Sequence, residues 1–424
     1  MRKILLVLLS LFLVTGCAEL EEVNETVTEA ITEANEIISA INEGNEEEVV
    51  ERDPIETTPI EDILIQGLKD RSSEIDISAF KLNDEQVKDI YYKVVNDNPQ
   101  YFWVQTTFEY TYYADGIVIA VKPKYQDLGD IETYENAISE ALKVVDEDMY
   151  DAEIALVLHD YLALNTKYDE AYLSGAEVSP VSYSSYGALV NQVAVCQGYS
   201  LAYIDLLKRC NIEAHYVSSE AMNHGWVQVK IEDEWYHVDV TWDDPYPDTP
   251  GNVNHQYFLK SDSSMGLGDQ PHHNWTSEYT CSKDYAGVWD IAKSAVYVER
   301  HQMIYVDGEP GSIRLMYKNL NTGEDKTLVT MNEKATWHIK GELLGGYWED
   351  IFTKLIYYNG KLYFNTAEDI YSLNLANSEV VKLTSIDPMN GYINGFDFKN
   401  SQIRIYLTFD PNEQERNLYT INLY

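Results

Sequence analysis

Residues 186–217 of the chain read YGALVNQVAVCQGYSLAYIDLLKRCNIEAHYV, and residues 223–245 read NHGWVQVKIEDEWYHVDVTWDDP. In the first stretch, apolar side chains recur after Cys196 at the spacing of a helix face: Tyr199, Ala202, Tyr203, Leu206, Leu207 and Cys210. Lys208 and Arg209 fall in the last turn, and Asn211 can cap it. The pattern predicts a helix that starts at or just before Cys196.

Cys196 therefore stands where a thiol becomes reactive. The first turn of a helix carries unpaired N–H groups and partial positive charge, and both favour the nucleophilic thiolate. The same N–H groups can hold a developing oxyanion, and Gly198 lets backbone or substrate come close. The alternative is a structural thiol at the start of the apolar stripe. For Cys210, roughly 21 Å further along the helix, the structural role is preferred.

The second stretch predicts an antiparallel hairpin. Gly225 to Ile231 and Trp235 to Trp242 alternate in polarity as strands do, with a polar turn between them. With a loop of even length, His224 and Asp239 share one face of the hairpin. A carboxylate in that position can orient an imidazole, and the imidazole can deprotonate a thiol.

The register of this hairpin leaves one alternative open. The simplest turn, at Asp233-Glu234, would place Asp243 rather than Asp239 opposite His224. A bulge or a sheared turn must close that gap. Asp243 is therefore a rival of Asp239 on the pattern alone.

Three motifs in these stretches resemble the transglutaminase-like superfamily, a branch of the papain-like cysteine enzymes. They are V-C-Q-G-Y around Cys196, H-G-W-V-Q-V from His224, and W-Y-H-V-D-V-T-W-D-D-P around Asp239. The resemblance implies an acyl-enzyme formed at an amide, whose acyl group passes to an amine or to water. It also implies Cys196 as nucleophile, His224 as base and Asp239 as the group that orients the imidazole, and it is the reason to keep Asp239 over Asp243.

Neighbouring residues allow further interpretations. Gln192 and the Tyr186 hydroxyl are candidates for a second oxyanion donor. A zinc site would combine residues that match no common ligand spacing: Cys196, His224, His237 and Asp239. A calcium site would use three acids without the glycine-punctuated loop of an EF-hand, so a solvated loop is preferred: Asp243, Asp244 and Asp248. The sequence predicts no metal and no cofactor.

The N-terminus is typical of a lipoprotein signal peptide over residues 1–16. Arg2 and Lys3 precede the apolar run Ile4 to Val14, which is well short of the roughly 20 residues that span a bilayer. The run ends in Leu13-Val14-Thr15-Gly16-Cys17, which resembles a bacterial lipobox with Cys17 as the lipidated residue. We expect a protein held by lipid to the extracytoplasmic side of the cell membrane. The alternative is an ordinary secretory signal that contains a cysteine.

Composition limits the partners. Acidic residues outnumber basic ones by 71 to 30, and a formal net charge of -41 repels phosphate backbones, so nucleic-acid binding is not expected. Solubility explains this charge, with basic peptides or divalent cations as alternatives. Outside the cytoplasm, the three cysteines after Cys17 leave at least one thiol unoxidised, and a Cys210–Cys281 pair is left open.

The rest of the chain divides by composition and periodicity. Residues 17–55 are acidic with a heptad-like apolar seam, which indicates a partly helical stalk or a disordered spacer. Residues 56–135 form a mixed α/β module, and residues 136–285 add two helical stretches to the motifs above, one of them over Asp151 to Asn165. Residues 290–424 switch to short strands, with a hairpin signal at Asn359-Gly360, and suggest propeller-blade-like repeats, too few to close. The predicted fold class is α+β, with a papain/transglutaminase-like core between the mixed module and an all-β domain.

The leading functional hypothesis is a surface thiol enzyme, a cysteine protease or acyltransferase acting on a peptide or protein substrate. The alternative is a binding or scaffold lipoprotein that carries an inactive transglutaminase-like module. A complete Cys–His–Asp set favours the enzyme, whereas the tyrosine-rich β region favours a binding role, with 34 tyrosines in the whole chain. The sequence indicates neither the oligomeric state nor the choice between hydrolysis and transfer.

Overall fold

The computed structural model describes residues 55–268, 270–331, 336–338, 347–349, 351–375, 377, 379–410 and 416–423. The predicted signal peptide, Cys17 and nearly all of the predicted stalk lie outside these residues. Within the described ranges, no helix combines the length and the apolar character that crossing a membrane requires.

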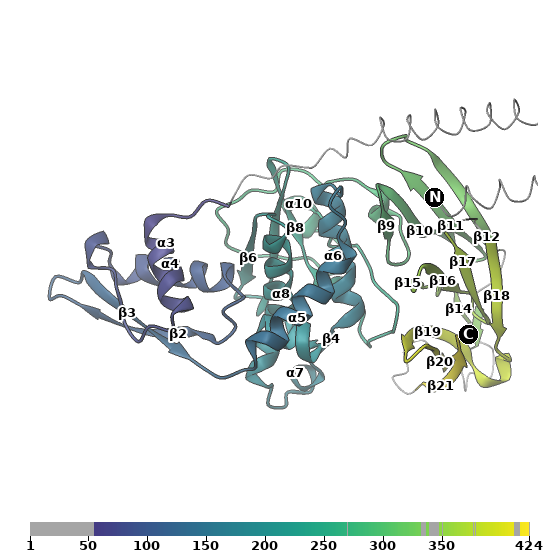
Figure 1. Cartoon of the computed structure of the whole chain (residues 1–424), viewed down its shortest axis with the longest axis horizontal. Coiled ribbons are helices and arrows are strands. Elements are labelled where there is room, and N and C mark those ends of the chain that lie inside the picture. Colours follow the sequence, from purple (N-terminus) through teal and green to yellow (C-terminus); the bar gives the residue numbers. More distant parts are fainter. Residues whose placement is uncertain are drawn as a thin grey trace, which may run out of the picture. The chain divides into compact units, whose positions relative to one another are not determined.

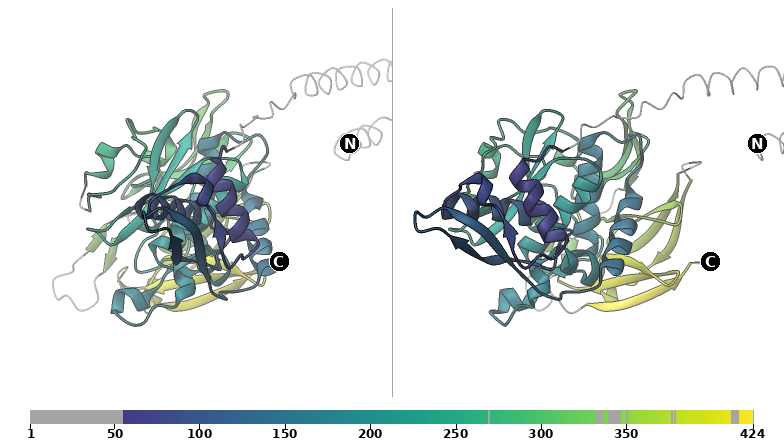
Figure 2. Two further views of the ribbon diagram at one scale, coloured as in Figure 1. Left: turned by 90° about the vertical axis from the view of Figure 1, so that its left-hand side faces the viewer. Right: turned by 60° about the vertical axis from the view of Figure 1, so that its left-hand side comes forward.

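The first described part is a three-stranded antiparallel sheet in the order β1 (Ile75–Asp76), β3 (Val118–Tyr125), β2 (Val104–Tyr112). Helices α3 (Pro59–Lys69) and α4 (Asp84–Asp97) pack against this sheet (Figures 1 and 2). Each helix begins with a capping box, which satisfies backbone N–H groups that the helix itself cannot pair. Helix and strand are mixed here as the sequence predicts.

The central part is built around α8 (Cys196–Arg209), which packs on the antiparallel sheet β6–β7–β8 and on α6 (Figure 1). Helix α6 covers the residues predicted for it, and nearly all of its side chains are buried. The bounds of these elements and their neighbours are α5 (Ile131–Ala141), α6 (Asp151–Asn165), β4 (Lys167–Tyr168), α7 (Glu170–Ser174), a π-helical turn (Gly187–Asn191), β5 (Val193–Ala194), β6 (Ala214–Ser219), β7 (His224–Ile231), β8 (Glu234–Val238) and α10 (Asp262–Met265).

The β7–β8 hairpin corrects the expected register. Ile231 pairs with Glu234, so the turn lies at Glu232-Asp233, one residue earlier than the simplest prediction. Glu232 adopts φ 56°, the left-handed conformation that a tight turn needs. The shift of the turn by one residue moves the pairing by two positions, so the residues that share a face of the paired strands stay the same and the register needs no bulge.

The second strand also ends earlier than predicted, at Val238 and not at Trp242. Asp239 is the N-cap of a short helix, α9 (Val240–Asp243), and its side chain accepts hydrogen bonds from two backbone N–H groups of that helix. An aspartate is among the most favourable residues for this role, so the cap wins over continued alternation. The cap turns the Asp239 carboxylate back toward the hairpin.

The C-terminal part consists of antiparallel sheets that remain open, because each ends in two different edge strands. Asn359 and Gly360 join two of these strands with positive φ at both positions, as the Asn-Gly signal predicts. The interpretation as propeller-blade-like repeats stays a prediction. The strands are β9 (Tyr297–Glu299), β10 (Gln302–Glu309), β11 (Ser312–Asn319), β12 (Asp325–Met331), β13 (Thr336–His338), β14 (Tyr347–Glu349), β15 (Leu355–Tyr358), β16 (Lys361–Asn365), β17 (Asp369–Asn374), β18 (Glu379–Ser385), β19 (Tyr392–Lys399), β20 (Gln402–Thr408) and β21 (Asn417–Asn422).

The start of this region is fastened to α6. The backbone N–H of Val296 donates to Asp160 at 2.8 Å, and the His301 ring pairs with Glu153 at 2.7 Å. The main apolar core continues as far as Tyr305. The predicted domain boundary near residue 290 therefore stays a prediction, and a cut there would break these contacts.

Candidate active site

Cys196 is the first residue of α8, as the sequence predicts, and its side chain is half-buried. The chain enters the helix from a segment fixed by a hydrogen bond from the Val195 N–H to the Ser182 carbonyl at 2.9 Å. A Cβ on Gly198 would lie 2.5 Å from the same carbonyl oxygen. Glycine at this position thus lets the helix start approach the neighbouring backbone, which sets the place of the thiol.

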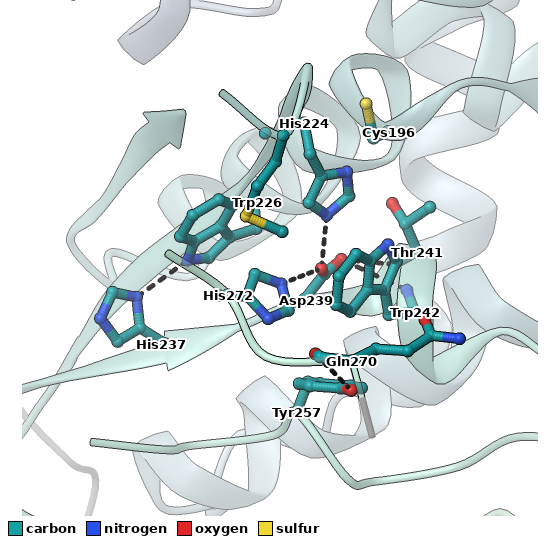
Figure 3. A network of polar contacts seen from close by, with 12 residues as sticks. Cys196, His224, Trp226, His237, Asp239, Thr241, Trp242, Tyr257, Gln270 and His272 are labelled. Carbon is teal, nitrogen blue, oxygen red and sulfur yellow. Dashed lines mark hydrogen bonds and ion pairs between the residues drawn. The ribbon is translucent and has the colours of Figure 1, made fainter. Parts of the chain in front are cut away.

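His224 lies between Cys196 and Asp239 (Figure 3). Its Nε2 is 2.6 Å from Asp239 Oδ2. Because an ionised carboxylate only accepts hydrogen bonds, Nε2 is the donor. The other ring nitrogen is left for Cys196, with which His224 also interacts.

The Asp239 carboxylate is 1% exposed, and hydrogen bonds hold both of its oxygens in place. Oδ1 accepts from the backbone N–H groups of Thr241 and Trp242, at 3.1 and 3.3 Å, and Oδ2 accepts from His224 and His272. Burial alone would raise the pKa of Asp239, but the two histidines outweigh it and lower that pKa below its usual range. The carboxylate is held ionised and cannot rotate without losing helix-capping bonds.

The imidazole of His224 is held between two indole rings. Its ring centroid is 5.7 Å from that of Trp226 and 4.9 Å from that of Trp242, with interplanar angles of 22° and 21°. Burial would lower the pKa of His224, yet the charge of Asp239 raises it to about 10. Stacked aromatic faces also favour the cationic ring. An imidazolium is thus available at neutral pH to stabilise a thiolate.

The Trp226 ring is held in place by a hydrogen bond to His237 (Figure 3). Its indole N–H donates to His237 Nδ1 at 2.9 Å, and His237 Nε2 lies 2.9 Å from Asp262 Oδ1. Since an indole N–H only donates, His237 Nδ1 must be the acceptor. His237 Nε2 then carries the proton and donates a hydrogen bond to Asp262. His237 therefore serves the packing of Trp226, while the zinc alternative would need it beside Cys196.

His272 is a member of the site that sequence reasoning missed. Its Nε2 is 2.8 Å from Asp239 Oδ2, and its Nδ1 is buried with no hydrogen-bond partner in the part of the chain that the structure describes. The ring packs against Trp242, at 4.0 Å between centroids, and against Trp226 at 4.7 Å. His272 lies 33 positions after Asp239, on a loop whose sequence has no periodicity, so no local signal links the two.

A serine joins the helix of Cys196 to the strand of His224. Ser200 Oγ lies 2.8 Å from the Cys196 carbonyl oxygen and 3.1 Å from that of Gly225, and its single proton can be shared between them. Ser200 is buried. The relative position of Cys196 and His224 is therefore set by one turn of α8 and by the first residues of β7.

The two candidate oxyanion donors, Gln192 and Tyr186, differ in how far they are exposed. Gln192 is exposed and ends the π-helical turn with φ 57°. The Tyr186 ring is 8% exposed and packs among Phe102 and Tyr134. Other tyrosines border the thiol: burial raises the pKa of Tyr168 and Tyr216, and the nearby charge of Cys196 adds to both shifts. The oxyanion roles of Gln192 and Tyr186 stay predictions.

Asp243 belongs to a second, separate cluster. Its Oδ2 is 3.2 Å from His159 Nε2, and it accepts from the Tyr257 N–H at 3.1 Å. His159 and His255 both pair with Asp160, at 2.9 and 2.8 Å. All of these side chains are buried, so His159 is a packed residue within an ionic core, and Asp243 is not part of a solvated loop as expected.

The acids of the calcium alternative point to different partners. Asp244 accepts from the Tyr199 hydroxyl at 2.5 Å, and Asp248 pairs with Lys167 at 2.6 Å, while Asp243 faces His159. By distance alone, three groups of described residues could each hold a metal ion: His159, Asp160 and His255; His224, Asp239 and His272; His237, Asp262 and Cys281. In each group, hydrogen bonds already join members to one another.

Cys210 and Cys281, both within the described residues, are not joined by a disulfide. Cys210 packs against the main apolar core, whereas the Cys281 sulfur accepts from Gln228 Nε2 at 3.2 Å. Burial raises the pKa of the Cys281 thiol to about 12. Cys281 is therefore inert at neutral pH.

Comparisons with known proteins agree with this geometry. Residues 138–240 match the family model described as the transglutaminase-like superfamily. No curated protein matches the sequence.

Among solved structures, the chain is similar to a TGase (12% identity, 38% of this chain, 49% of that chain, TM-score 0.24). It is also similar to the N-terminal domain of Nup159 (13%, 47% and 41%, 0.19) and to an arylamine N-acetyltransferase of Mycobacterium smegmatis (13%, 61% and 88%, 0.21). The chain spans about half the length of that TGase, and these low scores carry no argument. The family match covers the helix of Cys196 and the hairpin of His224 and Asp239, so residues 138–240 are similar to the transglutaminase-like superfamily.

Proposed function

We propose that the chain is a thiol enzyme in which Cys196 is the nucleophile, His224 its base and Asp239 the group that orients the imidazole. The observation that carries this proposal is the 2.6 Å pair of His224 and Asp239 beside a half-buried cysteine at a helix start. The family match supports acyl-transfer chemistry in general. The residue roles and the reaction at an amide bond are our inference.

In a first step that precedes substrate binding, the Cys196 proton passes to the ring nitrogen of His224 that does not face Asp239, and the resulting thiolate–imidazolium pair is the resting state at neutral pH. The thiolate attacks the carbonyl carbon of an amide, and the N–H groups of the first turn of α8 hold the oxyanion. As the C–N bond breaks, His224 returns the proton to the leaving amine, and a thioester remains on Cys196. Water or a second amine, deprotonated by His224, then takes the acyl group and restores the thiol.

Asp239 and His272 act through His224 in this scheme. Asp239 stabilises the imidazolium that forms in the first step, because both carboxylate oxygens are already aimed by four hydrogen bonds. The two indole rings keep the imidazole from turning away. His272 is a positioning residue, since it reaches only Asp239.

The competing function is a binding or scaffold protein whose transglutaminase-like core is inactive. This alternative predicts that no thiol is alkylated rapidly, because an inactive core does not need a thiolate. We further propose that the open sheets of residues 290–424 are blade-like repeats that present the core to a peptide or protein substrate. Their exposed strand residues, among them Val381 and Tyr419, support a contact surface but identify no partner.

Alkylation by iodoacetamide across pH separates these functions. The enzyme should show one fast thiol, mapped by mass spectrometry to Cys196, that reacts well below the pH of about 8.5 at which an ordinary thiol ionises. His224→Ala should move that profile upward. Cys210→Ala, on the same helix, is the matched control and should leave it in place. A chain without a fast thiol, or with Cys210 as the fast one, supports the scaffold instead.

For localisation, we propose a lipid anchor at Cys17 on the extracytoplasmic side of the cell membrane. The short apolar run and the residues Val14-Thr15-Gly16 before Cys17 support it. Cys17→Ser should leave the chain unlipidated and uncleaved by the lipoprotein pathway. Mass spectrometry of the mature N-terminus tests this, and a wild-type chain that starts at another residue would overturn it.

A further inference from the structure

One loop runs from the end of α9 into the C-terminal sheets and back. We call residues 244–254 the bridging loop and residues 290–424 the β region. At the start of the loop, Asp244 accepts from the Tyr199 hydroxyl at 2.5 Å. At its end, the Asn254 N–H donates to the carbonyl oxygen of the last residue of α9 at 2.8 Å. Both ends of the loop are therefore fixed beside α9.

The middle of the bridging loop is held by the β region. Arg416 donates to the Asp248 carbonyl oxygen at 2.6 Å and to the Thr249 hydroxyl at 3.1 Å. The Phe396 N–H donates to the Pro250 carbonyl oxygen at 3.2 Å. These bonds replace the water that the loop carbonyls would otherwise bind, so the β region fixes the path of the loop.

A buried lysine and a glycine bring the loop and the sheets close together. Lys354 is 3% exposed, and its ammonium group donates to Asn252 Oδ1 at 2.8 Å. Gly251 has φ 83°, and a Cβ there would lie 2.9 Å from Ile356 Cδ1. Glycine at this position is needed both for its conformation and for the close approach to the β region.

Asp248 connects this hold to the segment that leads into Cys196. Its carbonyl oxygen binds Arg416, while its carboxylate pairs with Lys167 at 2.6 Å. Lys167 belongs to β4, which pairs with β5, and its N–H donates to the Gln192 carbonyl oxygen at 2.9 Å. Strand β5 ends two residues before Cys196. One residue of the loop thus touches both the β region and the approach to the thiol.

The second connection to the site runs through α9. This helix has four residues, too few for an isolated helix to be stable in water, so its place depends on what holds its two ends. Asp239 caps one end, and the bridging loop continues from the other. On the core side, Asp243 accepts from the Tyr257 N–H at 3.1 Å. Between the two ends, the Trp242 ring stacks on His224 at 4.9 Å between centroids (Figure 3).

The bridging loop is also stiff. It contains three prolines, Pro245, Pro247 and Pro250, and each of them fixes its own φ. A chain with few free torsions passes on a displacement that a flexible chain would absorb. A displacement of the loop within the β region should therefore reach α9.

We propose that the β region is a positioning part of the active site, acting through Arg416, Lys354 and the bridging loop. The loop fixes the Trp242 ring against His224, and it fixes the strand that leads into Cys196. The inference rests on the proposed function, because it assumes that His224 acts on the Cys196 thiol. It goes beyond that function in giving the β region a role inside the site, in addition to any contact with a partner.

Iodoacetamide alkylation of Cys196 across pH, measured together with thermal melting, tests this in the full chain. Arg416→Met keeps an apolar stem but removes the hydrogen bonds to the loop. A displaced α9 should loosen the pair of Asp239 and His224, and a misplaced reacting group can cost up to about a hundredfold in rate. We expect the profile to move up by at least about half a pH unit, a loss of about threefold in rate near pH 7. A β region that only adds stability would lower the melting temperature and leave the profile in place.

Asn252 provides a second pair of variants. Asn252→Ala leaves Lys354 without this acceptor and should move the profile in the same direction. Asn252→Asp still accepts from Lys354 and should keep the wild-type profile. The control is Arg404→Met, which should also keep it. Arg404 lies on the same sheet, and its hydrogen bonds within the described chain go to Asp397 and not to the bridging loop.

The outcomes separate the two proposals. A profile moved by Arg416→Met and Asn252→Ala, but not by Asn252→Asp or Arg404→Met, supports the positioning role. Fast alkylation of Cys196 in the wild type, with the same profile in all four variants, overturns that role while the thiol enzyme stands. An equal shift in Arg404→Met overturns it as well, because a general loss of rigidity would then explain the result. Slow alkylation of Cys196 in the wild type overturns both proposals.

Discussion

Replacing Asp239 by asparagine tests the electrostatic core of the site. The new amide could still cap α9 through its oxygen, but its NH₂ group would face the Nε2–H groups of His224 and His272, two donors. His224 would lose its counter-charge while staying buried. Its imidazolium would then no longer be favoured at neutral pH.

The magnitude follows from the pair distance. Two unit charges 2.6 Å apart attract by roughly 6 kcal/mol at an effective dielectric constant of about 20. The rise in the pKa of His224 from 6.5 to about 10 corresponds to roughly 5 kcal/mol after the opposing cost of burial. Without Asp239, only Cys196 still opposes the effect of burial, so the pKa of His224 should fall. We expect the alkylation profile of Cys196 to move up by at least about one pH unit, a tenfold or greater loss of rate near pH 7.

The assay is iodoacetamide alkylation of Cys196 between pH 5 and 10, with urea unfolding measured on the same proteins. Asp243→Asn is the matched control, because Asp243 is equally buried and pairs with His159 instead. Both variants should lose stability, on the order of 3–5 kcal/mol for a broken buried pair. Only Asp239→Asn should move the profile. An unmoved profile in Asp239→Asn, or an equal shift in Asp243→Asn, would refute the reasoning.

Four further outcomes are expected. His272→Gln keeps a hydrogen-bond donor for Asp239 and should preserve the pH profile of Cys196 alkylation. His272→Phe removes the donor and should move that profile to higher pH. Equal profiles for the two variants, at equal melting temperature, would contradict the positioning role of His272. Gly198→Ala, which in most helices would stabilise by about 0.5–1 kcal/mol, should lower the melting temperature and slow alkylation, since its Cβ meets the Ser182 carbonyl at 2.5 Å. The raised pKa of His224 means that its stabilisation is complete below about pH 6.5 and is lost as pH rises toward about 10, so melting temperature should fall over that range more in wild type than in His224→Gln. A chain ending near residue 288 should melt cooperatively but at lower temperature, because it lacks the Val296–Asp160 bond; an insoluble product would show that the boundary is wrong.

Local signals determined much of this protein. The start of α8 at Cys196 and the whole of α6 follow from apolar spacing and end residues, which depend on neighbours three or four positions apart. The Asn359-Gly360 turn follows from the positive φ that its two residues tolerate. Which residues of β7 and β8 share a face follows from the period of a strand, but only as far as Val238. Asp239 lies beyond the strand and reaches His224 from its position as the N-cap of α9.

The choice between Asp239 and Asp243 was only half accessible to the sequence. The family resemblance favoured Asp239, while the simplest hairpin register favoured Asp243. The fold separates them because Asp239 caps α9 and so leaves the strand, and Asp243 then lies one helical turn further on, facing His159. The free energies of capping α9 with Asp239 and of continuing the strand differ by about a few tenths to a few kcal/mol. The spacing of residues in the sequence does not show which of the two is favoured.

Only the tertiary structure could bring the remaining parts together. His272 reaches Asp239 across 33 positions of chain, and the buried Ser185 hydroxyl donates to the Pro99 carbonyl oxygen across 86 positions. His159, Asp160, Asp243 and His255 likewise form one buried cluster from three separate segments. Such contacts arise because each segment buries apolar side chains in a common core. The free energy of that burial depends on the area removed from water and not on how far apart the segments lie in the sequence. The sequence thus identified the residues that we propose to carry the chemistry, and the packing of distant segments decided what holds those residues in place.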